Sequence, residues 1–342
     1  MKNVSIIIPT YNSMRTLKLC LDAILKQNYD HNAMEIIFAD GGSTDGTVEM
    51  IQTYSAVTDV TIILFENPLR TAEAGKAVGV RKASNEIVAL IDSDNILPDN
   101  QWLKSMMHPF EEENIVASEP IEYTYRREDS VINRYCALIG MNDPMCIFTG
   151  NYDRMNLITN KWTQVERDEI DMGDYLSIKF RANMIPTIGA NGFFMRKDKL
   201  VLNFEGDYLF DIDVLWELFT KEPELRVAKV KTGIIHLFCP DTKTFYRKQK
   251  RRIKDFIYFN DQKGRKYPWN KVSKWKLLGF IASCVFIIPL IIQAIIGYSR
   301  KRDFKAWSFH IVACWITLWV YGWGTIGGLF KKEMVNRDGW KQ

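Results

Sequence analysis

Histidine is scarce in this 342-residue sequence, and its cysteines do not form closely spaced pairs. There are four histidines and six cysteines, and no Cys-x-x-Cys pair occurs. This argues against a zinc site or a disulfide framework and suits a reducing compartment. We expect no signal peptide, because the sequence opens at once with the apolar strand 4–8, and we expect the N-terminal body to stay in the cytosol. We see no internal repeat and no low-complexity tract. The cysteines are Cys20, Cys136, Cys146, Cys239, Cys284 and Cys314.

Charge is unevenly distributed in a composition that is otherwise ordinary for a globular protein. The net charge is only +4, but residues 243–276 hold thirteen Lys and Arg against two acidic residues. That segment is therefore +11 and the remainder is −7. Such a segment could bind nucleic acid, but two long apolar runs follow it directly. We therefore expect it to face anionic membrane lipids, and we expect no nucleic-acid partner.

Two uncharged apolar runs near the C-terminus predict a two-helix membrane segment. Residues 277–297 and 306–330 are 21 and 25 residues long, and about 20 apolar residues cross a bilayer as a helix. Two buried helices of a soluble core are the less favoured alternative, and Pro289 could kink the first helix. The loop 299–305 is basic, which the positive-inside rule places in the cytosol, whereas two spans attached to a cytosolic enzyme place it outside. A hairpin that dips into one leaflet would ease this conflict.

Apolar strands alternate with amphipathic helices along residues 4–119. This pattern predicts an α/β fold with a mostly parallel sheet that is covered on both faces. Gly75 and Gly79 weaken the third expected helix. We expect strands at 4–8, 35–39, 60–65, 86–91 and 115–118, and helices around 17–25, 48–51, 72–83 and 101–110.

The chain is less regular after residue 119. We interpret residues 120–185 as an insertion over the sheet edge. A strand is expected at 185–190, a helix at 210–220, and two short strands at 226–230 and 233–237.

Two carboxylates, Asp92 and Asp94, flank Ser93 directly after the buried strand 86–91. Carboxylates this close repel each other, but a divalent cation between them would remove the repulsion. Mg²⁺ typically takes one or two carboxylates plus substrate phosphates. A solvated turn that caps the next helix is the alternative, and this tripeptide alone does not decide between them.

Two further polar clusters also follow predicted strands. In open α/β sheets, ligands bind beyond the carboxyl ends of the strands, so the three clusters together predict a site. Asp40 could accept hydrogen bonds from a nucleobase, and Tyr11 could stack on a flat ring. Pro9 could equally serve to shape its turn, and we prefer turn and cap roles for the loop residues after Gly42. The two clusters are residues 9–12 (PTYN) and 40–46 (DGGSTDG).

In order and spacing, these segments resemble family 2 glycosyltransferases of the GT-A fold. The matching segments are residues 4–12, 40–47 and 92–94, and the resemblance covers the first 120 residues well and the rest loosely. It implies a Rossmann-like catalytic domain, a nucleoside-diphosphate-sugar donor, and inverting transfer to an acceptor hydroxyl. It also implies that Asp92 contacts the nucleotide and that Asp94 binds Mg²⁺ or Mn²⁺. The nucleotide-sugar-binding candidates are Pro9, Tyr11, Asn12, Asp40, Lys76, Asp92 and Ser93.

The chain departs from the family pattern before the fourth strand, where an Ala-Arg-Asn-x-Gly run is common. Residues 75–79 read Gly-Lys-Ala-Val-Gly instead. Lys76 could keep a positive charge near the diphosphate. An exposed basic helix face is the alternative.

The resemblance places the catalytic base at Asp211, although Phe210 stands where the family usually has Glu. Asp213 and Asp207 are fallback candidates, and helix capping is the alternative role for Asp211. His236 ends a predicted strand, and the resemblance implies that it completes the metal shell. A structural role for this histidine is the alternative.

We therefore predict a membrane-attached, metal-dependent glycosyltransferase with a lipid-linked acceptor, on the cytoplasmic face of the cell membrane. The expected domains are 1–240 (1–119 for the nucleotide sugar and 120–240 for the acceptor), a basic interfacial segment 241–276, two membrane helices in 277–330, and a tail 331–342. Two other functions stay open. One is a sugar-phosphate nucleotidyltransferase, and the other is a non-catalytic membrane scaffold of the same fold.

Overall fold

A computed structural model describes residues 2–181, 184–203, 206–261, 265–267 and 273–328. The chain divides into two units. Of the described residues, the first unit contains those up to Ile121 together with Glu166–His236, and the second contains Glu122–Val165 and those from Leu237 to Gly328. The predicted tail 331–342 lies outside the described residues, as do parts of the predicted basic segment.

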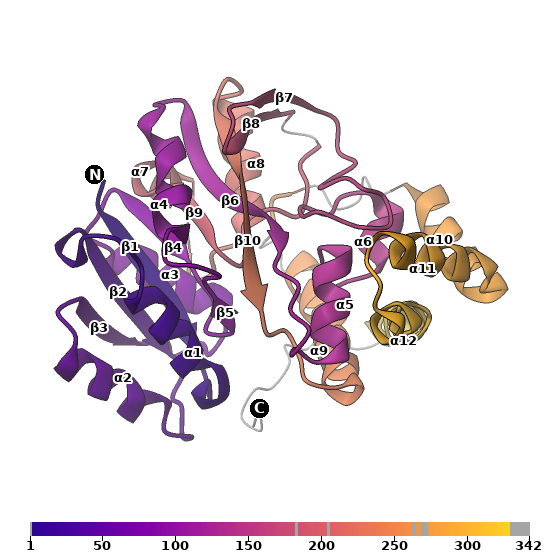
Figure 1. Ribbon diagram of the computed structural model, residues 1–342, viewed down its shortest axis with the longest axis horizontal. Helices are drawn as coiled ribbons and strands as arrows, with labels where there is room; N and C mark the ends of the chain where they lie inside the picture. The colour runs from indigo at the N-terminus through magenta and orange to yellow at the C-terminus, as the bar shows by residue number, and fades with distance from the viewer. Residues whose placement is uncertain (1, 182–183, 204–205, 262–264, 268–272, 329–342) are drawn as a thin grey trace. The chain divides into compact units, whose positions relative to one another are not determined.

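A ten-stranded mixed sheet forms the centre of the first unit (Figure 1). Its strands are β1 (Val4–Thr10), β2 (Met34–Asp40), β3 (Thr61–Glu66), β4 (Ile87–Leu90), β5 (Asn95–Ile96), β6 (Ile115–Tyr123), β7 (Arg167–Asp171), β8 (Tyr175–Phe180), β9 (Phe193–Arg196) and β10 (Arg226–His236). Their order is β3-β2-β1-β4-β9-β6-β10-β8-β7, with β5 paired to β10. The strands β3, β2, β1 and β4 are parallel, and β9 is antiparallel to β4. The prediction of a mostly parallel sheet thus holds for this half only.

The helices predicted between the parallel strands are present. Every residue of β1, β2 and β4 is buried, as expected for strands covered on both faces. The helices of this unit are α1 (Met14–Leu25), α2 (Thr47–Val57), α3 (Ala72–Lys82), α4 (Trp102–Met107), α7 (Lys197–Leu202) and α8 (Asp211–Lys221).

Two glycines of α3 allow this helix to lie unusually close to β1. A Cβ on Gly75 would lie 2.7 Å from Cβ of Pro9, and a Cβ on Gly79 would clash with the side chain of Ile7. Glycine lowers the intrinsic stability of a helix, which is why the sequence suggests a weak helix here. The structure shows that the lost propensity accompanies close packing of α3 on the sheet.

The strand expected at 185–190 is absent, and that prediction is wrong. Ile185 and Ile188 are buried, which accounts for the apolar signal. However, the N–H of Ile188 bonds back to the carbonyl of Pro186 at 2.8 Å, and Gly189 has a φ of +124°. These residues therefore form a loop, and the strand β9 begins only at Phe193.

The sequence pattern also misses part of the sheet's other half. The hairpin of β7 and β8 lies within the region interpreted as irregular and turns at Gly173, which has a φ of +97°. The two short strands expected at 226–230 and 233–237 are a single strand, β10.

The second unit is helical. Its helices are α5 (Val131–Ile139), α6 (Met145–Thr149), α9 (Thr242–Asp261), α10 (Lys274–Phe286), α11 (Ile288–Arg300) and α12 (Phe304–Gly328). The helix α12 packs against α5, α9 and α11. The core of this unit contains Tyr135 of α5, Phe245 of α9, and Trp307 and Phe309 of α12.

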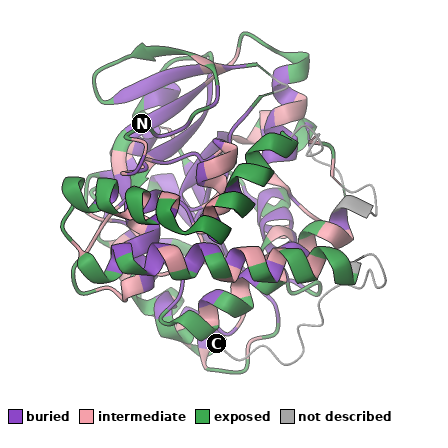
Figure 2. Cartoon of the chain, turned by 90° about the vertical axis from the view of Figure 1, so that its right-hand side faces the viewer, coloured by how far each residue is buried: buried purple, intermediate pink, exposed green. Residues whose placement is uncertain are grey.

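The first expected membrane helix, 277–297, is not one helix. It is broken at Ile287, where φ is +62°, and α10 and α11 meet at an angle of 92°. Pro289 explains the break because it lacks an N–H and its ring excludes a continuous helix. Among the described residues, α12 alone is long and apolar enough to cross a membrane as an unbroken helix, by length and composition. Figure 2 shows the exposed residues that run along these C-terminal helices.

Candidate active site

The sheet brings the three predicted polar clusters to one edge of the first unit. In the parallel pairing of β1 with β2, Thr10 lies opposite Asp40, and in that of β1 with β4, Ile7 lies opposite Leu90. The segments that follow these strands therefore leave the sheet at its carboxyl edge. This is the edge where open α/β sheets bind ligands.

Asp40 is buried at the end of β2, and its carboxylate is surrounded by donors. Oδ1 accepts hydrogen bonds from the hydroxyls of Thr10 and Ser43 at 2.7 and 2.6 Å. Oδ2 accepts from the backbone N–H groups of Gly42 and Ser43 at 2.9 and 2.8 Å. A carboxylate offers about four acceptor sites, so these bonds occupy Asp40. In this structure Asp40 shapes the loop after β2, and its contact with a nucleobase stays a prediction.

Asn12 joins the loops that follow β1 and β2. It adopts a φ of +51°, its N–H donates to Oγ of Ser43 at 2.8 Å, and its Oδ1 accepts from the N–H of Thr44 at 2.9 Å. The ring of Tyr11 lies beside Gly41, where an added Cβ would be 3.2 Å from Cδ2 of the ring. Together these contacts form a rigid rim at the sheet edge.

The Asp92-Ser93-Asp94 tip is held from both sides. The N–H of Asp92 donates to Oδ1 of Asn95 at 3.1 Å, and the hydroxyl of Ser93 donates to Oγ of Ser13 at 2.9 Å. Asp94 points to the end of β10, where its Oδ1 lies 3.5 Å from Nε2 of His236. The structure thus brings together the two predicted metal ligands, although 142 positions of sequence separate them.

Burial raises the pKa of the Asp92 carboxyl above its usual value. The Lys76 ammonium acts in the opposite direction, and Asp94 adds to the rise. Oδ1 of Asp92 is buried and has no hydrogen-bond partner among the described residues. An unsatisfied buried oxygen is costly unless another group bonds to it.

Lys76 lies in α3 and contacts a carboxylate far along the chain. Its Nζ donates to Oδ2 of Asp211 at 3.1 Å, and its side chain is only 6% exposed. Burial alone would lower the pKa of Lys76, but Asp211 and Asp92 outweigh burial and hold that pKa above its usual value. The side chain is therefore a buried cation, and the interpretation as an exposed basic helix face is wrong.

Asp211 is the first residue of α8, and Phe210 occupies the cap position without a side-chain bond. Burial raises the pKa of Asp211 to about 7, although the neighbouring Lys76 lowers it, and Asp92 and Glu73 contribute to the rise. Oδ1 of Asp211 is buried and lacks a hydrogen-bond partner among the described residues. A carboxylate that titrates near neutral pH is suited to accept a proton.

The two fallback base candidates differ in their surroundings. Asp213 is buried within α8, and its N–H bonds to the carbonyl of Phe210 at 3.0 Å. Asp207 is exposed. Asp211 contacts the Lys76 ammonium, which favours it as the base.

The sequence resemblance includes the loop 189–194 as the acceptor-side loop before α8, but sequence reasoning misses Glu119 and Lys229, which support that loop. Gly189 lies against Asp211 so closely that an added Cβ would be 3.1 Å from Cγ of Asp211. The N–H of Gly189 donates to Oε1 of Glu119 at 3.1 Å, and Oε2 of Glu119 bonds to Nζ of Lys229 at 2.5 Å. The side chains of Glu119 and Lys229 are wholly buried. The only sequence signal was a charged residue within each of two apolar strands.

The loop that carries Gly189 is also tied to the Asp92 tip. Nδ2 of Asn95 donates to Oδ1 of Asn191 at 3.0 Å, and Asn95 also accepts the N–H of Asp92. A single loop therefore contacts both the predicted metal side and the predicted base.

Asp94 and His236 fit a divalent cation that takes its other ligands from a substrate. No group of three or more His, Cys, Asp or Glu side chains among the described residues is arranged to hold a metal ion alone. Mg²⁺ is commonly bound by one or two carboxylates together with substrate phosphates and water. The buried, unsatisfied Oδ1 of Asp92 is a further oxygen at the same tip.

Comparison with known proteins points to sugar transfer. Residues 5–166 match the family model described as glycosyl transferase family 2. Glycosyltransferase AglE of Haloferax volcanii is 30% identical over 139 residues, which cover 40% of this chain and 45% of that protein. Glycosyltransferase GlyG of Streptococcus pneumoniae is 28% identical over 139 residues, covering 41% and 44%. The matched part thus spans less than half the length of these relatives.

One solved structure is similar over most of its length. It is the mannosyltransferase PcManGT from Pyrobaculum calidifontis in complex with GDP-Man and Mn²⁺. The two chains superpose with a TM-score of 0.56 at 15% sequence identity, covering 97% of this chain and 88% of the other. At this identity the likeness establishes a shared fold, and the expected GT-A architecture is confirmed.

Proposed function

The chain belongs to glycosyl transferase family 2, and from this premise we propose that it transfers a sugar from a nucleoside-diphosphate sugar to an acceptor hydroxyl, with inversion. One observation supports the proposal above others. A buried Lys76–Asp211 pair and an Asp94–His236 pair belong to one electrostatic cluster, since Asp92 interacts with Lys76, Asp94 and His236. Such a cluster combines groups that can neutralise an anionic leaving group with a carboxylate that can accept a proton.

Each group has a distinct task in this mechanism. Asp211 takes the proton from the acceptor hydroxyl as the hydroxyl oxygen attacks the anomeric carbon. The bond from that carbon to the diphosphate breaks, and its electron pair leaves with the nucleoside diphosphate. Lys76 would stabilise the negative charge that develops on the leaving diphosphate.

Asp94 and His236 would hold Mg²⁺ or Mn²⁺ in this proposal. When bound, the metal would act as a Lewis acid on the leaving diphosphate. A structure with the same fold contains GDP-Man together with Mn²⁺, which supports a metal used together with a nucleotide sugar. Pro9, Tyr11, Asn12, Asp40, Asp92 and Ser93 would form the nucleotide side of the site.

We further propose a lipid-linked acceptor and a location at the cell membrane, with the catalytic unit on the cytoplasmic face. The apolar C-terminal helices support membrane attachment. The first 119 residues would bind the nucleotide sugar, and the residues from 120 to 240 would contribute to acceptor binding.

A panel of nucleotide sugars, with Mn²⁺ or Mg²⁺ and a lipid extract as the acceptor source, tests this function. We expect release of nucleoside diphosphate with at least one donor, and loss of that release in Asp94→Asn. Asp198→Asn is the matched control, because Asp198 is an exposed carboxylate on α7. Pyrophosphate release from a sugar phosphate and a nucleoside triphosphate would instead support a nucleotidyltransferase. Absence of donor binding by calorimetry across the panel would favour a non-catalytic scaffold.

A further inference from the structure

The broken helix pair α10–α11 is too short in either part to cross a bilayer. Each helix has 13 residues, which corresponds to about 20 Å of rise, whereas the hydrocarbon core is about 30 Å thick. The angle of 92° between them prevents their lengths from adding. The break lies at Ile287, which has a positive φ, two residues before Pro289.

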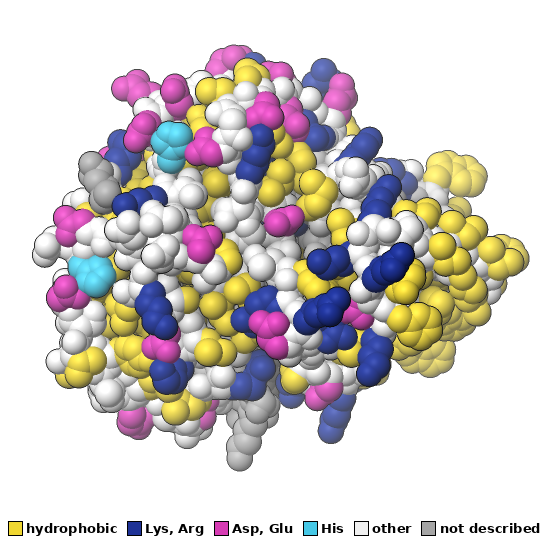
Figure 3. Space-filling view, viewed as in Figure 1, with side chains coloured by type: hydrophobic (Ala, Val, Ile, Leu, Met, Phe, Trp, Pro, Cys, Tyr) yellow, Lys and Arg dark blue, Asp and Glu magenta, His cyan; other side chains and the backbone are white. Residues whose placement is uncertain are grey.

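One side of this helix pair packs on its own unit, and the other side is an apolar surface. Phe280, Cys284 and Leu290 are buried against Cys314 of α12. Hydrophobic side chains gather over these helices in Figure 3, with Lys and Arg side chains beside them. The exposed large apolar residues of the pair are Trp275, Leu277, Leu278, Ile281, Val285, Phe286, Ile287, Ile288, Ile291, Ile292, Ile295 and Ile296.

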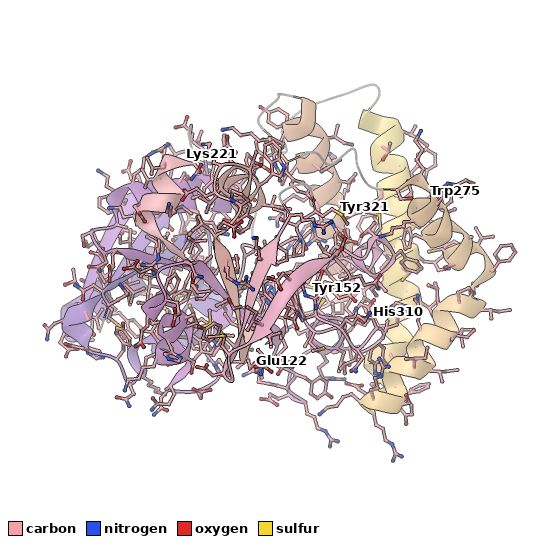
Figure 4. The ribbon with its side chains drawn as sticks, turned by 90° about the horizontal axis from the view of Figure 1, so that it is seen from above. Glu122, Tyr152, Lys221, Trp275, His310 and Tyr321 are labelled. Atoms are coloured by element: carbon pink, nitrogen blue, oxygen red, sulfur yellow. The ribbon has the colours of Figure 1, made fainter. Side chains whose placement is uncertain are left out.

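The helix α12 is long enough to cross a bilayer, but it makes buried polar contacts with its neighbours as well as apolar ones. Oη of Tyr321 donates to Oδ2 of Asp143 at 2.6 Å and also bonds to Oε1 of Gln249 in α9 at 3.2 Å. His310 bonds to Oη of Tyr135 in α5 at 2.8 Å. Tyr321 lies on the side of α12 that faces these helices, whereas Trp275 points away from them (Figure 4).

The helix α9 makes a crossing by α12 costly. Ile253 of α9 lies so close to Gly324 of α12 that an added Cβ would be 2.7 Å away, and Phe245 of α9 contacts Phe309 of α12 with ring centres 5.4 Å apart. If α12 crossed the hydrocarbon core, α9 would lie at the same depth. Charged side chains are strongly disfavoured there. The exposed basic residues of α9 include Lys243, Arg247, Lys250 and Lys254.

The tryptophans of α12 also suit a helix that lies along the membrane surface. Trp315, Trp319 and Trp323 are 42%, 59% and 57% exposed and form one stripe at four-residue spacing. Tryptophan prefers the interface between headgroups and hydrocarbon. Trp315 is near the middle of a 25-residue helix, so a crossing helix would place this tryptophan near the centre of the bilayer.

We propose that α10–α12 form a monotopic anchor that inserts into one leaflet of an anionic phospholipid bilayer and does not cross it. The apolar surface of α10–α11 enters the acyl region, and the stripe on α12 lies at the interface. Basic residues lie at the ends of these helices, Lys274 and Lys276 at the start of α10, Arg300 at the end of α11, and Lys301 and Arg302 between α11 and α12. Their charge matches anionic headgroups. In this arrangement the basic loop stays on the same side as the rest of the unit, which satisfies the positive-inside rule.

Cysteine labelling of the full chain tests the topology. Arg302→Cys reports on the basic loop, and Glu128→Cys reports on another exposed site of the same unit. The wild-type chain gives the background, because five of its six cysteines are buried and the sixth is half-buried. A membrane-impermeant maleimide should label both variants in inside-out bacterial membrane vesicles and neither in intact cells. Labelling of Arg302→Cys in intact cells would show that α10–α11 cross the membrane, and labelling of a third variant, Gln342→Cys, would show that α12 crosses it; either result would overturn the proposal.

Vesicle binding tests the surface itself. The double variant Ile291→Glu/Ile295→Glu places charges on the exposed face of α11 and should lose binding to vesicles of phosphatidylcholine and phosphatidylglycerol. Val57→Glu is the matched control, because Val57 is 79% exposed on α2 of the other unit, and it should bind as the wild type does. Wild-type affinity should fall about tenfold or more without phosphatidylglycerol. Unchanged vesicle binding of the double variant would overturn the proposal. So would a wild-type dimer in detergent-free buffer that the double variant dissociates, because the apolar surface would then bind a second copy of the chain.

Discussion

The contact between Gly189 and Asp211 leads to a sharp prediction for Gly189→Ala. In the structure an added Cβ at position 189 would lie 3.1 Å from Cγ and 3.3 Å from Cα of Asp211, and closer still to its Cβ. Carbon atoms at optimal separation are about 3.5–4.0 Å apart. Asp211 therefore has to move by about 1 Å, and a misplacement of that size in a catalytic group can cost about 10²-fold in rate.

The backbone strain of this substitution has a matched control. Gly189 has a φ of +124°, a conformation that an alanine adopts only at a cost of about 1–3 kcal/mol. Gly173 has a φ of +97° in the same unit, but an added Cβ there would meet nothing within 4 Å. Gly173→Ala therefore carries the strain without the clash with Asp211.

The assay compares both alanine variants with the wild type in donor affinity, by calorimetry, and in kcat for sugar transfer. We expect Gly189→Ala to lose about 10²-fold in kcat with donor affinity unchanged, and Gly173→Ala to keep both. Equal kcat values for the two variants would refute the positioning of Asp211 by Gly189. An inactive wild type would instead count against the proposed function.

Three further predictions concern the same cluster. Asp211 must be ionised to accept a proton, and its pKa is about 7, so kcat/KM should rise with pH through that value. Because Lys76 lowers this pKa, Lys76→Met should move the rise to higher pH. A pH profile that the substitution leaves unchanged would contradict this. In Asp94→Asn, titration calorimetry should show loss of the Mn²⁺-dependent part of donor affinity, and full retention of that part would exclude Asp94 as a ligand. In Glu119→Gln, thermal or urea unfolding should show a loss of roughly 3–5 kcal/mol, since the substitution leaves Lys229 charged and buried; a loss below about 1 kcal/mol would contradict that expectation.

The parallel half of the sheet could be predicted because its signals are local. The strands β1, β2 and β4 are buried on both faces, so each is a continuous apolar run, and each is followed by polar loop residues at the sheet edge. The Asp92–Asp94 tip is a local pattern of this kind. Its functional interpretation needed only the neighbouring strand ends.

The remaining parts depend on contacts between distant residues, which periodicity does not reveal. Lys76 and Asp211 are 135 positions apart, and Glu119 and Lys229 are 110 apart. The prediction of a strand at 185–190 failed for a different reason, because the apolar residues of this segment are buried in a loop. Burial and hydrogen-bonded pairing are separate properties, and hydrophobicity reports only the first.

The apolar C-terminal run shows a similar limit. Composition gives its length, but the length available for crossing depends on the bend at Ile287 and on the charged helix beside α12. Both depend on tertiary structure. Counting apolar residues therefore predicted two long helices, whereas the described residues form a broken helix pair and one long helix, α12.

The saturated carboxylate of Asp40 has a consequence for ligand entry. Four hydrogen bonds hold Thr10, Gly42 and Ser43 in place without any ligand. If a nucleotide binds at this rim as proposed, it meets backbone that is already held by hydrogen bonds, so little conformational entropy would be lost on binding. Discrimination between bases would then depend on these main-chain groups, and we expect Asp40→Ala to admit a wider range of nucleotides at lower affinity.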